Sequence, residues 1–215
     1  MEEYLKPGKY INSDHPEVIK FVNANTASVD SVHDKIVALY YAVRDGFRYD
    51  PYRLDFTEEA IRASHIVSRE YGYCIEKSCL FAAGARVLGV PARMGFANVT
   101  NHIGTSKLEE VLHTNVLVFH GYAEVWLNNR WVKVTPVFNK ALCDKLNVDA
   151  LEFNGVDDAV FQSYDREGDR FMEYLHDYGT FSDIPYTMLI DELMKHYPHL
   201  AEHILNTRVL DLTKL

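Results

Sequence analysis

Cys74 is the residue of this sequence best placed to act as a nucleophile. It follows Gly72 and Tyr73 and opens an apolar run that predicts one helix, ending at Gly89 with Pro91 just beyond. Unpaired backbone N–H groups at a helix N-terminus act as about half a positive charge, which favours the thiolate over the thiol. The sequence therefore predicts a reactive thiol, able to attack a carbonyl carbon and form a thioester.

A thiol nucleophile needs a base, and His120 is the candidate. It begins the segment HGYAEVWL, and the next residues, NNRWVKVTP, complete a pattern that predicts a β-hairpin. A cysteine at a helix start, a histidine on a strand and a polar residue on the next strand form a recurring plan for acyl transfer. His113 is the alternative base, but it precedes the strand and is disfavoured.

The register of the hairpin decides whether Thr135 can complete a triad. A two-residue turn at Asn128-Asn129 places Trp126 opposite Trp131, an aromatic pair that antiparallel strands favour. The same register places Thr135 on the face that carries His120. A slip of one residue would move the threonine to the other face.

Three sequence blocks, in this order, resemble the transglutaminase-like superfamily of papain-type cysteine enzymes: YYAVRDGFRYDPY, GYCIEKSCLFAAGARVLGVPARMGF and HGYAEVWLNNRWVKVTP. The resemblance covers about half the chain, and the later segment DREGDRFMEYLHDYGTFSDIP is similar to a bacterial subgroup of predicted cysteine proteases. It implies an α+β, papain-like fold in which the helix bearing Cys74 packs on an antiparallel sheet. It also implies that Cys74 is the nucleophile, that His120 is the base, and that the position of Thr135 is usually an aspartate.

The residue that orients His120 is open between Thr135 and Asn139. A threonine hydroxyl can accept the Nδ1–H bond that fixes the imidazole tautomer, although it brings no charge. Asn139 is the substitute if the chain after Pro136 folds back. The backbone N–H of Cys74 is the expected oxyanion donor, because it lies at the positive end of the helix.

Composition and charge limit the other functions open to the chain. With 215 residues and 47% hydrophobic composition, we expect a single domain over residues 1–215. Its core is expected at about 30–140 and a C-terminal helical extension at about 141–215. A formal net charge of −9 without a basic stripe disfavours nucleic acid. The N-terminus, MEEYLKPGKY, is polar and no apolar run approaches a membrane span, so we expect a cytoplasmic protein.

The pattern of apolar and turn residues predicts the elements around the site. Helices are expected at 16–23, 31–44, 57–69, 157–178 and 188–205, and strands at 92–98, 114–127 and 131–135. The small residues Ala82-Ala83-Gly84-Ala85 would let the helix bearing Cys74 lie close to the sheet.

No metal or nucleotide cofactor is expected. His196, His199 and His203 share one predicted helix face, but no Cys, Asp or Glu completes a ligand set. Cys79 and Cys143 are expected to be free thiols that fill space in the core or at the surface. The predicted activity is therefore hydrolysis of an amide bond, peptide or isopeptide, in a peptide or a small amide. The alternatives are transamidation and a non-catalytic binding module that kept the fold.

Overall fold

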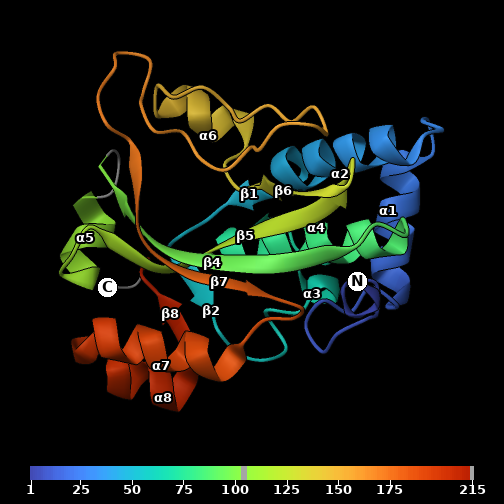
Figure 1. Cartoon of the computed structure of the whole chain (residues 1–215). Helices are drawn as coiled ribbons and strands as arrows, with labels where there is room; N and C mark the ends of the chain where they lie inside the picture. The colour runs from blue at the N-terminus through green and yellow to red at the C-terminus, as the bar shows by residue number, and fades with distance from the viewer. Residues whose placement is uncertain (103–105, 214–215) are drawn as a thin grey trace.

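A four-stranded antiparallel sheet forms the centre of the fold (Figure 1). The computed structural model describes residues 1–102 and 106–213. Strands β4 (Ala92–Asn101), β5 (Val116–Leu127) and β6 (Arg130–Val134) follow one another along the chain. A fourth strand, β7 (Met172–Phe181), pairs with the free edge of β4, so the order across the sheet is β6-β5-β4-β7. This arrangement confirms the predicted α+β class.

The β5–β6 hairpin has the register predicted from the sequence. Trp126 pairs with Trp131, and the centroids of their rings lie 5.5 Å apart in an edge-on contact. Asn128 and Asn129 have φ angles of 51° and 61°, the left-handed conformation that a two-residue turn of this kind requires. The turn chemistry therefore fixes which face each strand residue occupies.

Helix α4 (Cys74–Val87) lies beneath the sheet and is buried along nearly its whole length. It begins at the predicted residue, where the side chain of Glu76 accepts the backbone N–H of Tyr73 at 3.0 Å. A carbon added at Gly84 would lie 2.8 Å from a methyl group of Leu39, on helix α2 (Val32–Gly46). Gly84 thus permits close packing against α2, not against the sheet as expected.

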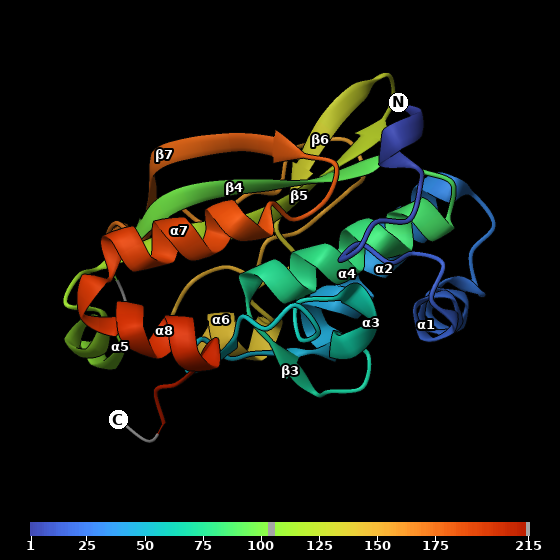
Figure 2. The ribbon, with the colours of Figure 1, turned by 90° about the horizontal axis from the view of Figure 1, so that it is seen from below.

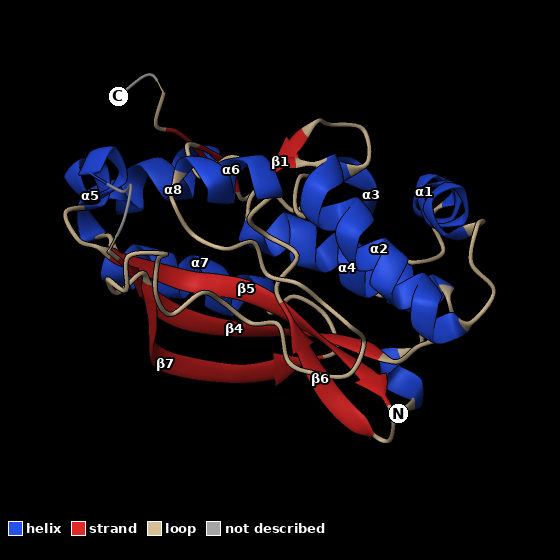
Figure 3. Cartoon of the chain, turned by 90° about the horizontal axis from the view of Figure 1, so that it is seen from above, coloured by secondary structure: helices blue, strands red, loops and turns tan. Residues whose placement is uncertain are grey.

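The helices before α4 cover its other side, away from the sheet (Figure 3). Helices α1 (Pro16–Thr26) and α2 (Val32–Gly46) form where the sequence predicted them. Helix α3 (Ala63–Ile66) is shorter than the predicted 57–69. Thr57 donates from its backbone N–H and its hydroxyl to the carboxylate of Asp55, at 2.9 and 2.7 Å. This local turn competes with helix formation.

The C-terminal third departs from the predicted helical extension. Only the short helix α6 (Lys140–Lys145) precedes strand β7, and the helix predicted at 157–178 is wrong. β7 pairs with β4 from Met94 to Asn101, and these distant backbone hydrogen bonds override the local helical spacing. Part of the C-terminal third therefore completes the central sheet.

The last elements return to the N-terminal half of the chain. Helix α7 (Tyr186–His196) is followed by a short 3-10 helix, η2 (Pro198–Leu200), and by α8 (Ala201–Thr207). The single helix predicted at 188–205 is broken by Pro198, which cannot continue the hydrogen-bonding of α7. Strand β8 (Val209–Asp211) then pairs with β2 (Arg53–Asp55).

Helix α5 (Ser106–Leu112) and the C-terminal helices gather at one end of the molecule (Figure 2). The remaining short elements are η1 (Glu2–Tyr4) and the parallel pair of β1 (Arg48–Tyr49) and β3 (Tyr71–Gly72). β3 leads directly into Tyr73 and Cys74. Within residues 1–102 and 106–213, the helices are too short or too polar to cross a bilayer.

Candidate active site

Strand β5 passes directly over the first turn of α4. A carbon added at Gly121 would lie only 3.0 Å from the Cα of Ile75, so the two backbones come this close only because residue 121 has no side chain. The hydroxyl of Ser78, one turn further along α4, donates to the carbonyl of Gly121 at 3.1 Å. These contacts place Cys74, the first residue of α4, beside the residue that follows His120.

Backbone N–H groups surround the sulfur of Cys74. Those of Gly121 and Ile75 donate to it, which favours the thiolate, as expected at a helix N-terminus. Burial acts in the opposite direction and is the larger effect, since it raises the pKa of the Cys74 thiol to about 11. The resting side chain is therefore a neutral thiol.

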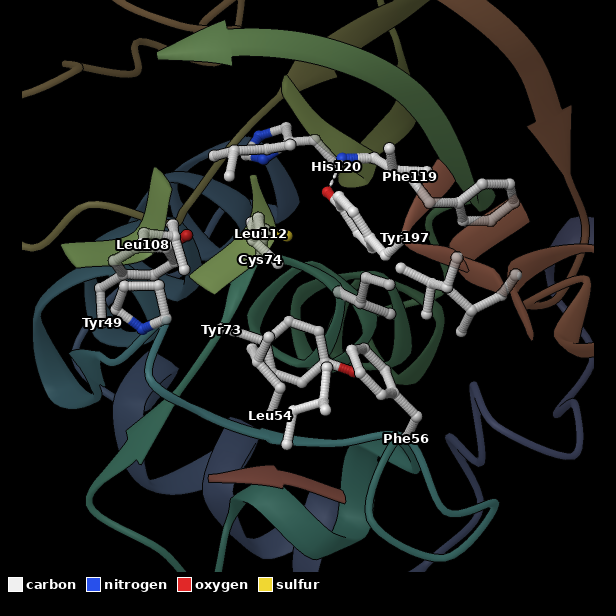
Figure 4. A pocket seen from close by; sticks show the side chains of 17 residues that line it. Tyr49, Leu54, Phe56, Tyr73, Cys74, Leu108, Leu112, Phe119, His120 and Tyr197 are labelled. Carbon is white, nitrogen blue, oxygen red and sulfur yellow. Dashed lines mark hydrogen bonds between the residues drawn. The ribbon is translucent and has the colours of Figure 1, made fainter. Parts of the chain in front are cut away.

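His120 lies in the same cavity as Cys74 (Figure 4). It is only 3% exposed, and this burial lowers the pKa of its imidazole to about 4. At neutral pH the imidazole is uncharged and can accept a proton. The structure thus places a neutral thiol and a neutral imidazole on one cavity, in place of the thiolate expected from the helix N-terminus alone.

A local irregularity in β5 sets the direction of His120. Phe119 adopts the left-handed conformation, with φ of 60°, and its backbone N–H donates to the Oδ1 of Asn98 at 3.0 Å. The β4–β5 register shifts between Ala97 and Val99, at the same place. Asn98 escaped the sequence analysis, and its only signal was a polar residue at the end of an apolar predicted strand.

Thr135 lies just after β6, where its backbone N–H donates to Ala159 at 2.8 Å. Its hydroxyl and the Nδ1 of His120 are both buried, and neither has a hydrogen-bond partner within the described part of the chain. The threonine and the histidine are therefore not joined in this structure. The role of Thr135 as the orienting residue stays a prediction.

The two alternative residues have other contacts. The side-chain oxygen of Asn139 accepts the backbone N–H of Tyr49 at 3.1 Å, which ties the start of α6 to β1. His113 stacks on His199, with ring centroids 4.1 Å apart, and is not among the residues that line the cavity. Asn139 and His113 therefore hold structural elements in place.

The cavity beside Cys74 and His120 has a volume of about 60 Å³. Most of the side chains in its wall are apolar. They include Leu54, Phe56, Leu112, Leu189, Leu193 and Leu210, together with residues of β5. The hydroxyl of Tyr197 donates to the carbonyl of Val116 at 2.8 Å and accepts from the N–H of Val118 at 2.9 Å. This residue fastens the C-terminal helices to β5 next to His120.

The C-terminal histidines each contact a group of their own. His196 lies 3.3 Å from the carboxylate of Glu192, and His203 lies 2.7 Å from the carbonyl of Val209. An acidic group that could hold a cation, formed by Asp165, Glu167 and Asp169, lies in a turn outside the cavity. Asp165 accepts two backbone N–H groups of that same turn, which accounts for the gathering of the carboxylates.

A cysteine at the start of a helix, packed under an antiparallel sheet that carries a histidine, is an arrangement found among thiol-dependent acyl-transfer proteins. The model of the transglutaminase-like superfamily matches residues 19–136, which is more than half of the chain. The protein belongs to this superfamily, a group of cysteine-dependent hydrolases and transferases.

One solved structure similar to this chain is that of a candidate cysteine protease from Cytophaga hutchinsonii. The two are 18% identical, and they superpose with a TM-score of 0.47 over 83% of this chain and 53% of the other. This chain thus spans about half the length of that protein. No curated protein matches the sequence.

Proposed function

We propose that the protein is a cysteine-nucleophile hydrolase that cleaves an amide bond through a thioester acyl-enzyme. The observation that carries the proposal is that Cys74, at the N-terminus of α4, and His120, on β5, line one cavity. Burial leaves the thiol and the imidazole uncharged, which is the state a general base and its nucleophile must have before the reaction.

The acylation step begins when His120 takes the proton of the thiol while the sulfur of Cys74 bonds to the carbonyl carbon. The carbonyl oxygen becomes an oxyanion, for which the backbone N–H of Cys74 is the proposed donor. The imidazolium then gives its proton to the amide nitrogen, the C–N bond breaks and the amine leaves. Because a separated thiolate and imidazolium are unfavourable in this cavity, we expect proton transfer and attack to occur together.

Water resolves the thioester in the second step. His120 takes a proton from the water molecule, whose oxygen bonds to the carbonyl carbon. The C–S bond breaks, and the proton returns to the sulfur as the carboxylic acid leaves. Hydrolysis is the proposed second step, and transamidation would differ from it only in that an amine attacks the same thioester in place of water.

Thr135 is the proposed orienting residue, because its buried hydroxyl and the buried Nδ1 of His120 each lack a partner among the described residues. A hydrogen bond between them would satisfy both groups. Without it, Cys74 and His120 act as a dyad. The rival reading, a binding module without activity, is opposed by the burial of Cys74 and His120 on one cavity.

Labelling with a thiol-directed acyl probe, followed by peptide mass mapping, tests the proposal. We expect the probe to modify Cys74, and we expect the label to disappear in Cys74→Ser. Cys79 and Cys143 are internal controls, since both are buried free thiols that do not line the cavity. Labelling of either of these in preference to Cys74 would overturn the assignment.

A further inference from the structure

The cavity next to Cys74 has a wall without charge. Within the described part of the chain, its lining residues include no Asp, Glu, Lys or Arg. Leu54, Phe56 and Tyr73 lie across the cavity from His120 (Figure 4). Apolar side chains of α5 and α7 also line the cavity. A group that enters this space leaves water for hydrocarbon on nearly all sides.

Apart from Cys74 and His120, the polar side chains of the wall are Tyr49, Tyr73 and Tyr197, and neutral hydroxyls cannot compensate a buried charge. The hydroxyl of Tyr197 is already committed to the backbone of Val116 and Val118. The hydroxyl of Tyr73 is buried without a partner in the described residues, and a single neutral hydroxyl cannot replace the hydration of a carboxylate or an ammonium group. The cavity therefore discriminates against charged groups.

A second, larger cavity of about 340 Å³ adjoins the first and differs from it in charge. The two share a wall formed by Tyr49, Pro51, Leu108 and Leu117. Arg48 and Asp50 also line the second cavity, and their charged groups lie 3.6 Å apart. The second space therefore offers a pair of charged side chains that the first lacks.

We propose that the cavity beside Cys74 is the acyl pocket of the enzyme and takes a short aliphatic group. The amine side of the scissile bond then lies in the second cavity. The proposal rests on the hydrolase function proposed above. The apolar lining of the cavity and its small volume of about 60 Å³ favour such a group.

The pocket predicts an order of reactivity among acyl donors that share one leaving group. In the full-length protein, the p-nitrophenyl esters of isovaleric, acetic and succinic acid should acylate Cys74 at different rates. Release of p-nitrophenolate in the first turnover measures each rate. We expect the isovalerate ester to react about tenfold faster than the other two esters, or more. The acetyl group leaves part of the pocket empty, and the succinyl group brings a charge into it.

Leu193→Ala tests the same pocket from the side of the protein. Leu193 lines the cavity from α7, so its truncation should shift the preference toward longer acyl groups such as octanoate. Leu205→Ala is the matched control, because Leu205 is 53% exposed and should leave the order of esters unchanged. Circular dichroism checks that both variants are folded. The order of the ester acylation rates in wild type is a second readout, which does not depend on either variant.

The outcomes separate the pocket from the chemistry. Equal acylation of Cys74 by all three wild-type esters would overturn the acyl pocket while leaving the hydrolase function intact. Absence of acylation by every ester would overturn both. Faster reaction of succinate would also reject the pocket, since a charged group would then be the preferred one.

Discussion

The side-chain oxygen of Asn98 accepts the backbone N–H of Phe119 at 3.0 Å, and this bond supports the left-handed conformation of the residue immediately before His120. A bulky residue with positive φ is strained by roughly 1–3 kcal/mol and persists only where its surroundings hold it. Asn98 belongs to the neighbouring strand β4, so the direction of the proposed base depends on a residue outside its own strand.

Asn98→Leu should therefore destabilise the fold and misplace His120. The substitution keeps the size of the side chain but leaves the Phe119 N–H buried without an acceptor, which costs about 1–3 kcal/mol. Urea unfolding should show this loss, and the NMR signal of the His120 ring should move. Asn98→Asp keeps an acceptor oxygen and is the control. If both variants behave alike, the hydrogen bond does not position His120.

The alkylation of Cys74 should depend on pH in the manner of an unpaired buried thiol. Because burial raises the pKa of Cys74 to about 11, its thiolate fraction grows about tenfold per pH unit between pH 6 and 9. The rate of reaction with iodoacetamide, followed by peptide mapping, should rise with the same slope. A rate that is already flat near pH 6 would instead indicate a preformed thiolate–imidazolium pair.

Thr135→Asp should raise the pKa of His120 above its depressed value of about 4. A carboxylate at this position would favour the imidazolium, whereas burial alone disfavours it. Histidine titration by NMR measures the change, and Thr135→Asn, which adds no charge, is the control. A His120 pKa that is the same in both variants would mean that residue 135 faces away, and Cys74 and His120 would then act as a dyad.

His120 should make the folded state sensitive to acid. Its pKa is about 4 in the folded protein and about 6.5 in an unfolded chain, so between these values the unfolded state binds the proton. This contribution to stability is present above pH 6.5 and is lost as the pH falls toward 4, by about 3 kcal/mol. Urea unfolding at pH 7 and at pH 4 measures this loss. Between the two pH values the free energy of unfolding should fall by about 3 kcal/mol more in wild type than in His120→Gln. Equal losses would show that the imidazole is hydrated.

Gly121→Ala should push β5 away from α4. Its new methyl group would lie 3.0 Å from the Cα of Ile75, and backbone atoms cannot yield as a flexible side chain would. We expect a destabilisation of about 1–3 kcal/mol and slower labelling of Cys74. Gly46→Ala is the matched control, since a carbon there meets nothing within 4 Å. Unchanged labelling in Gly121→Ala would contradict the close packing of β5 on α4.

Local chemistry explains what the sequence could predict. The turn at Asn128 and Asn129 sets the hairpin register, and the start of α4 at Cys74 follows from the residues around it. Both features depend on neighbours in the chain. That Cys74 and His120 lie near each other could be predicted in the same way, because the prediction requires only the helix, the hairpin and their order along the chain.

Contacts between distant residues explain what could not be predicted. β7 became a strand because it pairs with β4, although its residues have helical spacing. The left-handed Phe119 contradicts its local preference and depends on Asn98. The charge state of Cys74 reverses the expectation from the helix N-terminus, because elements far along the chain bury the sulfur.

The pairing of β2 with β8 has a consequence for biosynthesis. Arg53 pairs with Asp211, so one wall of the Cys74 cavity is synthesised long after the strand against which it packs. During translation the helix that carries the thiol can form while Leu210 and α7 are still missing. A nascent chain that stops short of β8 would therefore present an open thiol, and the cavity beside Cys74 is complete only when these late residues arrive.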